Sequence, residues 1–258
     1  MKKNILKIAA VCAMSALMIS ALAGCGATKD KKDDTTASAD KLVMATNAEF
    51  PPYEYHENDK IVGIDAEVAQ AIADKLGMEL EIDDMAFDSI IPAVQSGKAS
   101  IGVAGMTVTE DRLVNVNFSD TYAHGKQVII VKDGSPIASP DDLKGKKVGV
   151  QTSTTGDIYI TDDYGDESVE RYQKGADAIQ ALLQDKIDAV VIDSEPAKVF
   201  VSENEGLKTV ETPYVEEDYA IALAKDNTEL LDKINSVLAE LKQDGTIDKI
   251  ISKYITSK

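Results

Sequence analysis

Residues 104–112 (AGMTVTEDR) combine the groups that bind a carboxylate. The apolar residues 101–104 predict a strand, which runs into a turn of glycine and threonine and then into the start of a helix. Gly105 allows a ligand close to the backbone, and the hydroxyls of Thr107 and Thr109 can cap the helix or donate outward. The guanidinium of Arg112 can give a planar anion two charge-assisted hydrogen bonds. The alternative is an ordinary turn with a solvated arginine.

The first 25 residues have the features of a bacterial export signal. Lys2, Lys3 and Lys7 precede a short apolar run, residues 8–23, and the sequence LAGC follows, ending at Cys25. A small-residue site followed directly by cysteine is similar to a lipobox. We therefore expect residues 1–24 to be removed and Cys25 to carry fatty acid such as palmitate, which would anchor the protein to the extracytoplasmic face of the cell membrane. A plain cleavable signal or a short membrane anchor is the alternative.

Residues 26–40 contain no large apolar side chain, so together with Cys25 they are expected to form a disordered tether. Fifteen flexible residues reach roughly 20 Å. The chain has two cysteines, Cys12 and Cys25. Cys12 lies in residues 1–24, called the leader below, so residues 41–258, called the body, are expected to have no disulfide.

The body is long enough for one large or two modest domains. The leader carries three lysines and no acid, so without it the net charge of −18 becomes −21. Such an acidic body is a poor partner for nucleic acid or anionic lipid heads. We also expect no cofactor and no metal, because His56 and His124 lack metal-ligand spacing.

Strands and helices alternate along the body, which predicts an α/β fold of two lobes. In the first lobe the expected strands are 42–46, 80–82 and 101–104, with helices at 65–76 and 87–95. In the second they are strands 127–131, 147–150, 168–172 and 188–192, with helices at 139–144, 155–164, 176–184 and 196–201, followed by the extended residues 208–212. A strand at 219–224 and helices at 229–243 and 247–254 are expected to return to the first lobe. This gives lobe 1 as 41–122 and 219–258, lobe 2 as 123–218, and crossings near 122–126 and 216–220.

Seven blocks of sequence follow one another along the body. They are residues 45–53 (ATNAEFPPY), 63–68 (GIDAEV), 87–94 (FDSIIPAV), 104–112, 116–120 (VNFSD), 149–156 (GVQ and TTG) and 188–193 (DAVVID). In this order the blocks resemble the solute-binding proteins of polar amino-acid ABC importers, and the resemblance covers essentially the whole chain after the leader. We read Asp65 and Glu67 in the second block as structural, because a first helical turn favours acids.

The resemblance implies a periplasmic-binding-protein fold of the second type, with two lobes joined by a two-stranded hinge. Such a protein closes on a free amino acid and delivers it to permease subunits and their ATPase. The implied site residues are Arg112, Ala104, Gly105, Thr107, Thr155 and Gln151 around the ligand, with Asp193 for the α-ammonium, Phe50 and Phe87 as pocket walls, and Asn47 at the side chain. Arg112 would bind the α-carboxylate, helped by the backbone around Gly105, the Thr107 hydroxyl and the Thr155 N–H.

Alternatives remain at several of these positions. Asp193 ends an apolar strand at the crest of the second lobe, yet it could simply cap the next helix. Phe50 and Phe87 could be ordinary core residues. The neutral amide of Asn47, where relatives that bind cations commonly have aspartate, favours glutamine as ligand. Glu49 could still supply a negative charge, so arginine or lysine stays open, as does cystine.

Three classes of function fit the resemblance. An importer receptor agrees with the anchor, the tether and the paired charges for a zwitterion. An enzyme of the same fold would need a general acid, and neither histidine has a nucleophile near it in sequence. A sensor would need a signalling segment, and we expect none after Lys258. We therefore expect a monomeric receptor that closes around its ligand.

Overall fold

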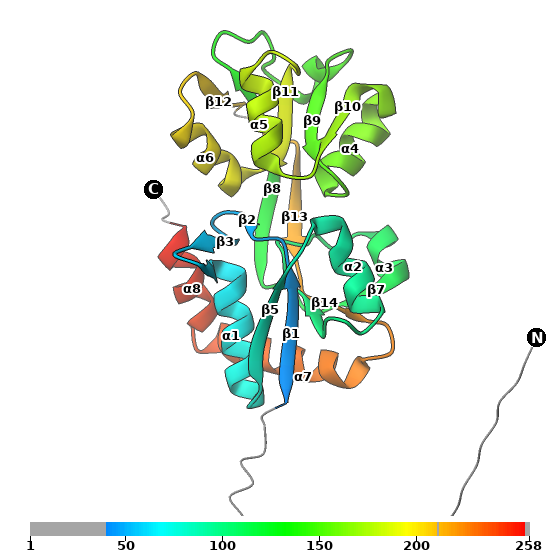
Figure 1. Cartoon of the computed structure of the whole chain (residues 1–258), viewed down its shortest axis with the longest axis vertical. Coiled ribbons are helices and arrows are strands. Elements are labelled where there is room, and N and C mark those ends of the chain that lie inside the picture. The colour runs from blue at the N-terminus through cyan, green and yellow to red at the C-terminus, as the bar shows by residue number, and fades with distance from the viewer. Residues whose placement is uncertain (1–39, 211, 256–258) are drawn as a thin grey trace, which may run out of the picture. The chain divides into compact units, whose positions relative to one another are not determined.

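The computed structural model describes residues 40–210 and 212–255, which belong to one compact unit (Figure 1). Cys25, the leader and nearly all of the expected tether lie outside the described residues. Two α/β lobes, each built around its own sheet, make up the unit, as predicted.

Lobe 1 contains a five-stranded sheet in the order β5-β1-β6-β14-β7, in which β1 is parallel to β5 and β6 and β14 is antiparallel to β6 and β7. Its strands are β1 (Lys41–Thr46), β5 (Glu79–Asp84), β6 (Ile101–Gly102), β7 (Val116–Phe118) and β14 (Ala222–Ala224). Its helices are α1 (Ile64–Leu76), α2 (Phe87–Gln95), α3 (Glu110–Asn115), α7 (Thr228–Gln243) and α8 (Thr246–Tyr254).

Helices cover both faces of this sheet, and strand alternation explains how. Leu42 and Met44 of β1 belong to the core that β1 shares with α1, α7 and α8, whereas Ala45 belongs to the core on the α2 side. Gly77 ends α1 in the left-handed conformation, with φ of 68°, and Gly245 separates α7 from α8 with φ of 76°. Both helix ends were predicted at these glycines.

Lobe 2 contains a six-stranded sheet in the order β10-β9-β11-β8-β12, with β13 also paired to β8. Its strands are β8 (Ala123–Lys132), β9 (Val148–Gln151), β10 (Val169–Tyr172), β11 (Ala189–Asp193), β12 (Leu207–Thr209) and β13 (Val215–Tyr219). Its helices are α4 (Thr155–Tyr164), α5 (Gly175–Leu183) and α6 (Ser194–Glu203), with short 3-10 turns η1 (Pro140–Leu143) and η2 (Asp166–Ser168).

The strands β8 and β13 form the ribbon between the lobes (Figure 1). They pair antiparallel from Ala123 opposite Tyr219 to Gln127 opposite Val215. Farther along, β8 pairs with β11 and β12 in the lobe 2 sheet. The lobe boundaries that we expect at 122/123 and 218/219 lie at the lobe 1 end of this ribbon and stay a prediction.

Some local features differ from the expectations. The strand at 101–104 ends at Gly102, because the chain leaves the sheet for the turn at Gly105. The single strand at 219–224 is two strands, β13 and β14, separated at residues 220–221 where the chain passes from the ribbon into the lobe 1 sheet. A small sheet of β2 (Glu49–Phe50), β3 (Glu54–Glu57) and β4 (Lys60–Val62) was not predicted, because its residues are mostly polar and two prolines, residues 51–52, separate β2 from β3.

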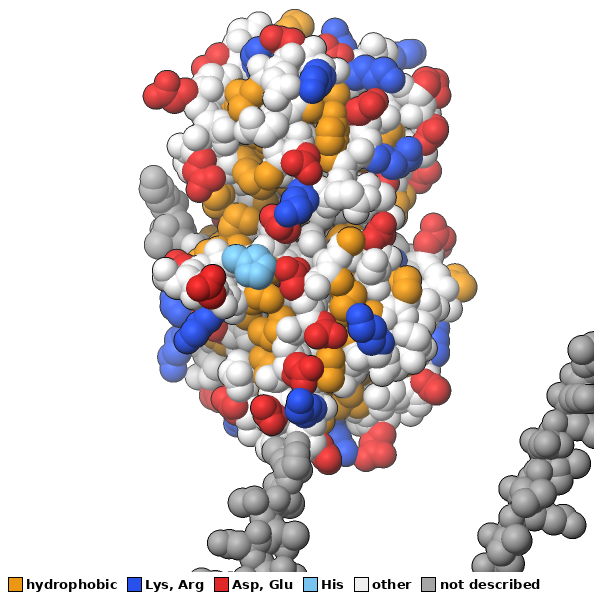
Figure 2. All heavy atoms as spheres, in the orientation of Figure 1, with side chains coloured by type: hydrophobic (Ala, Val, Ile, Leu, Met, Phe, Trp, Pro, Cys, Tyr) orange, Lys and Arg blue, Asp and Glu red, His pale blue; other side chains and the backbone are white. Residues whose placement is uncertain are grey.

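Acidic and basic side chains are interspersed over the face of the molecule seen in Figure 2. Along residues 40–255, apart from the undescribed residue 211, no helix has the length and apolar character that a membrane crossing requires.

Candidate functional site

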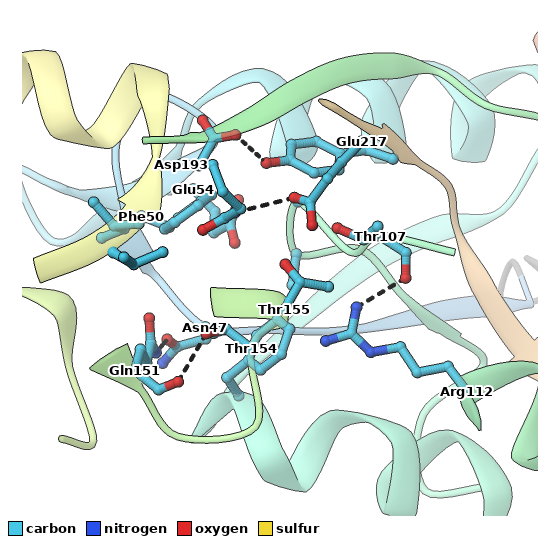
Figure 3. A pocket seen from close by; sticks show the side chains of 17 residues that line it. Asn47, Phe50, Glu54, Thr107, Arg112, Gln151, Thr154, Thr155, Asp193 and Glu217 are labelled. Atoms are coloured by element: carbon cyan, nitrogen blue, oxygen red, sulfur yellow. Dashed lines mark hydrogen bonds between the residues drawn. The ribbon is translucent and has the colours of Figure 1, made fainter. Parts of the chain in front are cut away.

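A pocket lies between the lobes, where the carboxyl ends of their parallel strands meet (Figure 3). Its lining comes from the ends of β1, β6, β9 and β11, from the starts of α2 and α4, and from the ribbon. All ten residues predicted from the sequence line it: Asn47, Phe50, Phe87, Ala104, Gly105, Thr107, Arg112, Gln151, Thr155 and Asp193. Seven further lining residues were not predicted: Glu54, Gln127, Thr154, Val191, Ile192, Glu217 and Tyr219.

Arg112 is buried in the wall of this pocket and is not a solvated side chain. Its Nη1 donates to the carbonyl oxygen of Thr107 at 2.8 Å, and its Nη2 donates to that of Ser153 at 3.1 Å. The ring of Phe87 lies beneath the guanidinium, 5.4 Å from its carbon to the ring centroid. Burial lowers the pKa of Arg112, and the negative charge of Glu217 opposes that shift. The group therefore stays a fixed cation with a set orientation.

The turn before Arg112 is fixed from behind by the buried carboxylate of Asp65. Its Oδ2 accepts from the Gly105 N–H at 2.7 Å and its Oδ1 accepts from the Tyr122 hydroxyl at 2.8 Å. The Gly105 N–H is thus bonded within the protein and is not available to a ligand. Thr109, not Thr107, caps α3, since its side chain accepts from the Arg112 N–H at 3.2 Å.

Asp193 both caps a helix and lines the pocket, so the two interpretations of this residue are compatible. Its Oδ1 accepts from the Glu195 N–H at 3.0 Å, which caps α6. Its Oδ2 accepts from the Lys126 N–H at 3.0 Å and from the Tyr219 hydroxyl. Burial raises the pKa of Asp193 to about 6, against the lowering effect of these hydrogen bonds.

Asn47 makes contacts to protein groups on both sides of the cleft. Its Nδ2 donates to the carbonyl oxygen of Met85 at 2.9 Å, and its Oδ1 accepts from Gln151 Nε2 at 2.8 Å. Glu49, the other residue considered for specificity, does not line the pocket. Its carboxylate forms an ion pair with Lys174 of lobe 2 at 2.5 Å. Asn47 and Glu49 therefore each make one contact across the cleft to lobe 2.

Two buried carboxylates in the pocket were missed from the sequence, Glu54 on β3 and Glu217 on β13. Each has one oxygen, Oε2 of Glu54 and Oε1 of Glu217, that is buried and has no hydrogen-bond partner. The other oxygen of Glu217 accepts from Gln127 Nε2 at 3.0 Å. Burial, reinforced by the charge of Asp65, raises the pKa of Glu54 well above its usual range. The alternation of Val215, Glu217 and Tyr219 on one face of a strand was the available signal.

The charges around the pocket are unbalanced toward the negative side. Asp193 and Glu217 line the pocket with one guanidinium, that of Arg112, and Glu54 adds a third carboxyl group, whose raised pKa favours its neutral form until a cation is near. A zwitterion uses one carboxylate and the guanidinium, which leaves negative charge for a further cation. Among residues 40–210 and 212–255, histidines, cysteines and acids form no group of three or more that could hold a metal ion.

The chain is similar over nearly its whole length to bacterial binding proteins. The family model of bacterial extracellular solute-binding proteins, family 3, matches residues 42–257. The arginine-binding extracellular protein ArtP of Bacillus subtilis (strain 168) is 36% identical over 264 residues, with 100% of both chains covered. A solved ancestral arginine-binding protein bound to arginine is 45% identical, with a TM-score of 0.79 and coverage of 84% of this chain and 99% of that one. An ancestral arginine-binding protein bound to glutamine is 43% identical, with a TM-score of 0.80 and coverage of 84% and 98%.

Proposed function

The chain belongs to family 3 of the bacterial extracellular solute-binding proteins, and on this premise we propose that it captures a free amino acid with a cationic side chain, arginine first, for an ABC importer. Membership in this family confirms the resemblance drawn from the seven sequence blocks and the expectation of a binding protein, not an enzyme. The observation that carries the choice of ligand is the pair of unpartnered, buried carboxylate oxygens of Glu54 and Glu217 in the pocket. Such oxygens are costly unless a donor reaches them, and a guanidinium offers five.

In the proposed complex, the head group of the amino acid lies between the two lobes. Arg112 binds the α-carboxylate, together with the Thr107 hydroxyl and the N–H of Thr155 at the start of α4. Asp193 binds the α-ammonium. The side chain lies between Phe50 and Phe87, and its positive charge meets Glu54 and Glu217.

Glutamine, our first expectation from Asn47, is the second candidate ligand. Neutral amides at Asn47 and Gln151 favour it, and so does the similarity to an ancestral protein whose solved structure contains glutamine. Because both amides already bind to protein groups, they support glutamine less strongly than the free carboxylate oxygens support arginine.

Binding is proposed to proceed by hinge closure of the ribbon, with contacts to lobe 2 gained as the lobes meet.

We further propose that a lipid on Cys25 anchors the protein to the outer face of the cytoplasmic membrane. The tether would let the monomeric body reach the permease subunits, whose ATPase powers uptake. A cell that incorporates labelled palmitate into the wild-type chain but not into Cys25→Ser would support the anchor, and equal labelling would contradict it.

Calorimetric titration with arginine, lysine, ornithine, histidine, glutamine and cystine tests the ligand assignment. We expect the tightest binding for arginine. Tighter binding of glutamine would indicate that Asn47 determines the specificity. In that case Asn47→Asp should change the order of preference among the amino acids. Absence of heat and of a thermal shift with every amino acid would contradict the proposed function.

A further inference from the structure

The turn that joins β9 to α4 meets lobe 1 at Arg112. Arg112 Nη2 donates to the carbonyl oxygen of Ser153, so the guanidinium assigned to the ligand also bonds across the cleft. Ser153 has φ of 64°, in the left-handed region that a serine seldom adopts. Hydrogen bonds must therefore keep Ser153 in this conformation.

Asp157, the third residue of α4, holds the backbone of Ser153. This side chain is buried, and its Oδ2 accepts from the Ser153 N–H at 2.9 Å. Thr154 stands at the N-cap of α4, yet its hydroxyl donates to the carbonyl oxygen of Gln151 at 2.8 Å and caps nothing. Asp157 thus holds the N–H of Ser153, whereas the peptide unit that contains the Ser153 carbonyl is held within the turn, where the Thr154 N–H donates to the carbonyl oxygen of Gln151 at 3.3 Å.

Arg171, on the edge strand β10, fixes Asp157 in turn. Its Nε donates to both oxygens of Asp157, at 2.8 and 3.0 Å. Its Nη1 donates to Asp166 Oδ1 at 2.6 Å and its Nη2 to Thr161 Oγ1 at 2.9 Å. These acceptors determine the plane of the guanidinium, although 35% of the side chain is exposed. Neither Arg171 nor Asp157 lines the ligand pocket.

We propose that Asp157 and Arg171 are positioning residues for ligand capture: their ion pair places the Ser153 carbonyl where Arg112 reaches it when the lobes close. The inference rests on the proposed function for its effect on affinity. Under the proposed hinge closure, this contact across the cleft forms as the lobes meet around the ligand. The pair therefore governs how long the closed complex lasts, with little influence on how fast a ligand arrives.

Stopped-flow and calorimetric measurements on the whole chain test this with Arg171→Gln, Arg171→Lys and the control Lys132→Gln. Lys132 forms a comparable ion pair with Asp185 at 2.8 Å on the same lobe, away from the cleft. We expect Arg171→Gln to weaken arginine binding about tenfold, through faster dissociation at an unchanged association rate. Arg171→Lys should recover only part of this loss, because one ammonium cannot reach three separate acceptors. An unchanged dissociation rate in Arg171→Gln would overturn the proposal.

Hydrogen exchange on the unliganded protein separates this inference from the proposed function. We expect Arg171→Gln to speed exchange of the Ser153 amide selectively, while amides of the β11 strand keep their protection. Unchanged exchange at Ser153, or a uniform increase along the chain, would overturn the inference. If the wild-type protein bound no amino acid, the proposed function would fail and the exchange result would still decide the role of Arg171.

Discussion

Glu217 lies at the centre of the electrostatics of the pocket, although its sequence context resembles a solvated acidic run. Its neighbours Glu216 and Asp218 are exposed, whereas Glu217 itself is buried on the inner face of the ribbon. One of its oxygens is bound to Gln127 and the other has no partner. A buried carboxylate so arranged favours a ligand that brings positive charge.

Glu217→Gln should therefore change the preference of the pocket among amino acids. The substitution keeps the size of the side chain and removes its charge, so a desolvated guanidinium loses an ionic partner. Truncation of such a pair costs roughly 2–5 kcal/mol, so we expect the dissociation constant for arginine to rise at least about thirtyfold. Binding of glutamine should weaken far less.

Calorimetry on Glu217→Gln and on the exposed neighbour Glu216→Gln checks this prediction. Glu216→Gln makes the same change of charge on the next residue, outside the pocket lining. Equal losses in the two variants would mean that long-range charge, and not the position of Glu217, determines the affinity for arginine.

The affinity for any amino acid should depend on pH through Asp193. Its pKa of about 6 lies above the usual range because the group is buried, and the charge of Glu217 adds to the effect. Only the ionised carboxylate attracts an α-ammonium, so binding should weaken as the pH falls below about 6, by at most about tenfold per pH unit for this group. Burial also raises the pKa of Glu54, so protonation of this carboxyl at falling pH weakens binding as well.

The stability of the unliganded protein should respond to pH with the opposite sign. A carboxyl whose pKa is raised by folding favours the folded state when it is protonated. The contribution of Asp193 is therefore fully present below its ordinary pKa of 3.8 and is lost as the pH rises through about 6. Denaturant titrations of the wild type and Asp193→Asn between pH 4 and pH 8 measure this contribution as their difference. A difference that does not vary with pH would contradict the assignment.

Among the elements, the ribbon of β8 and β13, which is the proposed hinge, also contacts the pocket carboxylate of Asp193. Tyr219 on β13 donates to Asp193, and Gly125 on β8 lies directly against both groups. A methyl group at Gly125 would overlap the Tyr219 hydroxyl and Asp193 Oδ2. The absence of a side chain there lets the ribbon pass close to the carboxylate of Asp193.

We expect Gly125→Ala to destabilise the fold by about 1–3 kcal/mol, the usual cost of overpacking, and to weaken binding by displacing Asp193. Thermal unfolding and calorimetry with arginine measure the two effects. His124→Ala on the same strand removes an exposed side chain and serves as the control. A Gly125→Ala protein with wild-type affinity would show that the Tyr219–Asp193 contact is not needed for binding.

Sequence patterns predicted the site where regular elements position it, and failed where irregular ones do. Arg112 and Asp193 follow apolar strands that end at the crest of a lobe, so their place could be inferred from periodicity and from the family resemblance. Glu54 and Glu217 lie on β3 and β13, short strands of mixed polarity. The alternation in β13 shows that Glu217 shares a face with Tyr219, but that this face is buried is a tertiary property that a local pattern does not contain.

At the scale of the whole molecule, polar contacts bridge the lobes beside the pocket and at its rim. Asn47 binds Gln151 and Arg112 binds the Ser153 carbonyl, both beside the pocket, whereas Glu49 and Lys174 form an exposed ion pair at the rim. Exposed pairs contribute roughly 0–1 kcal/mol. The rim pair is therefore too weak to determine closure. Closure must depend on the two contacts beside the pocket, at Asn47 and at Arg112, and on the ligand itself.

Small-angle scattering with and without arginine tests whether the contacts beside the pocket, and not the rim pair, determine closure. We expect arginine to reduce the radius of gyration of the wild-type protein, because a ligand held by both lobes shifts the population to the closed form. Lys174→Gln should close in the same way at slightly higher ligand concentration. Arg112→Gln should stay open, since it loses both the partner of the α-carboxylate and the fixed charge beside Ser153. A wild-type radius of gyration that arginine leaves unchanged would contradict closure. A Lys174→Gln protein that no longer closes would show that the rim pair controls closure.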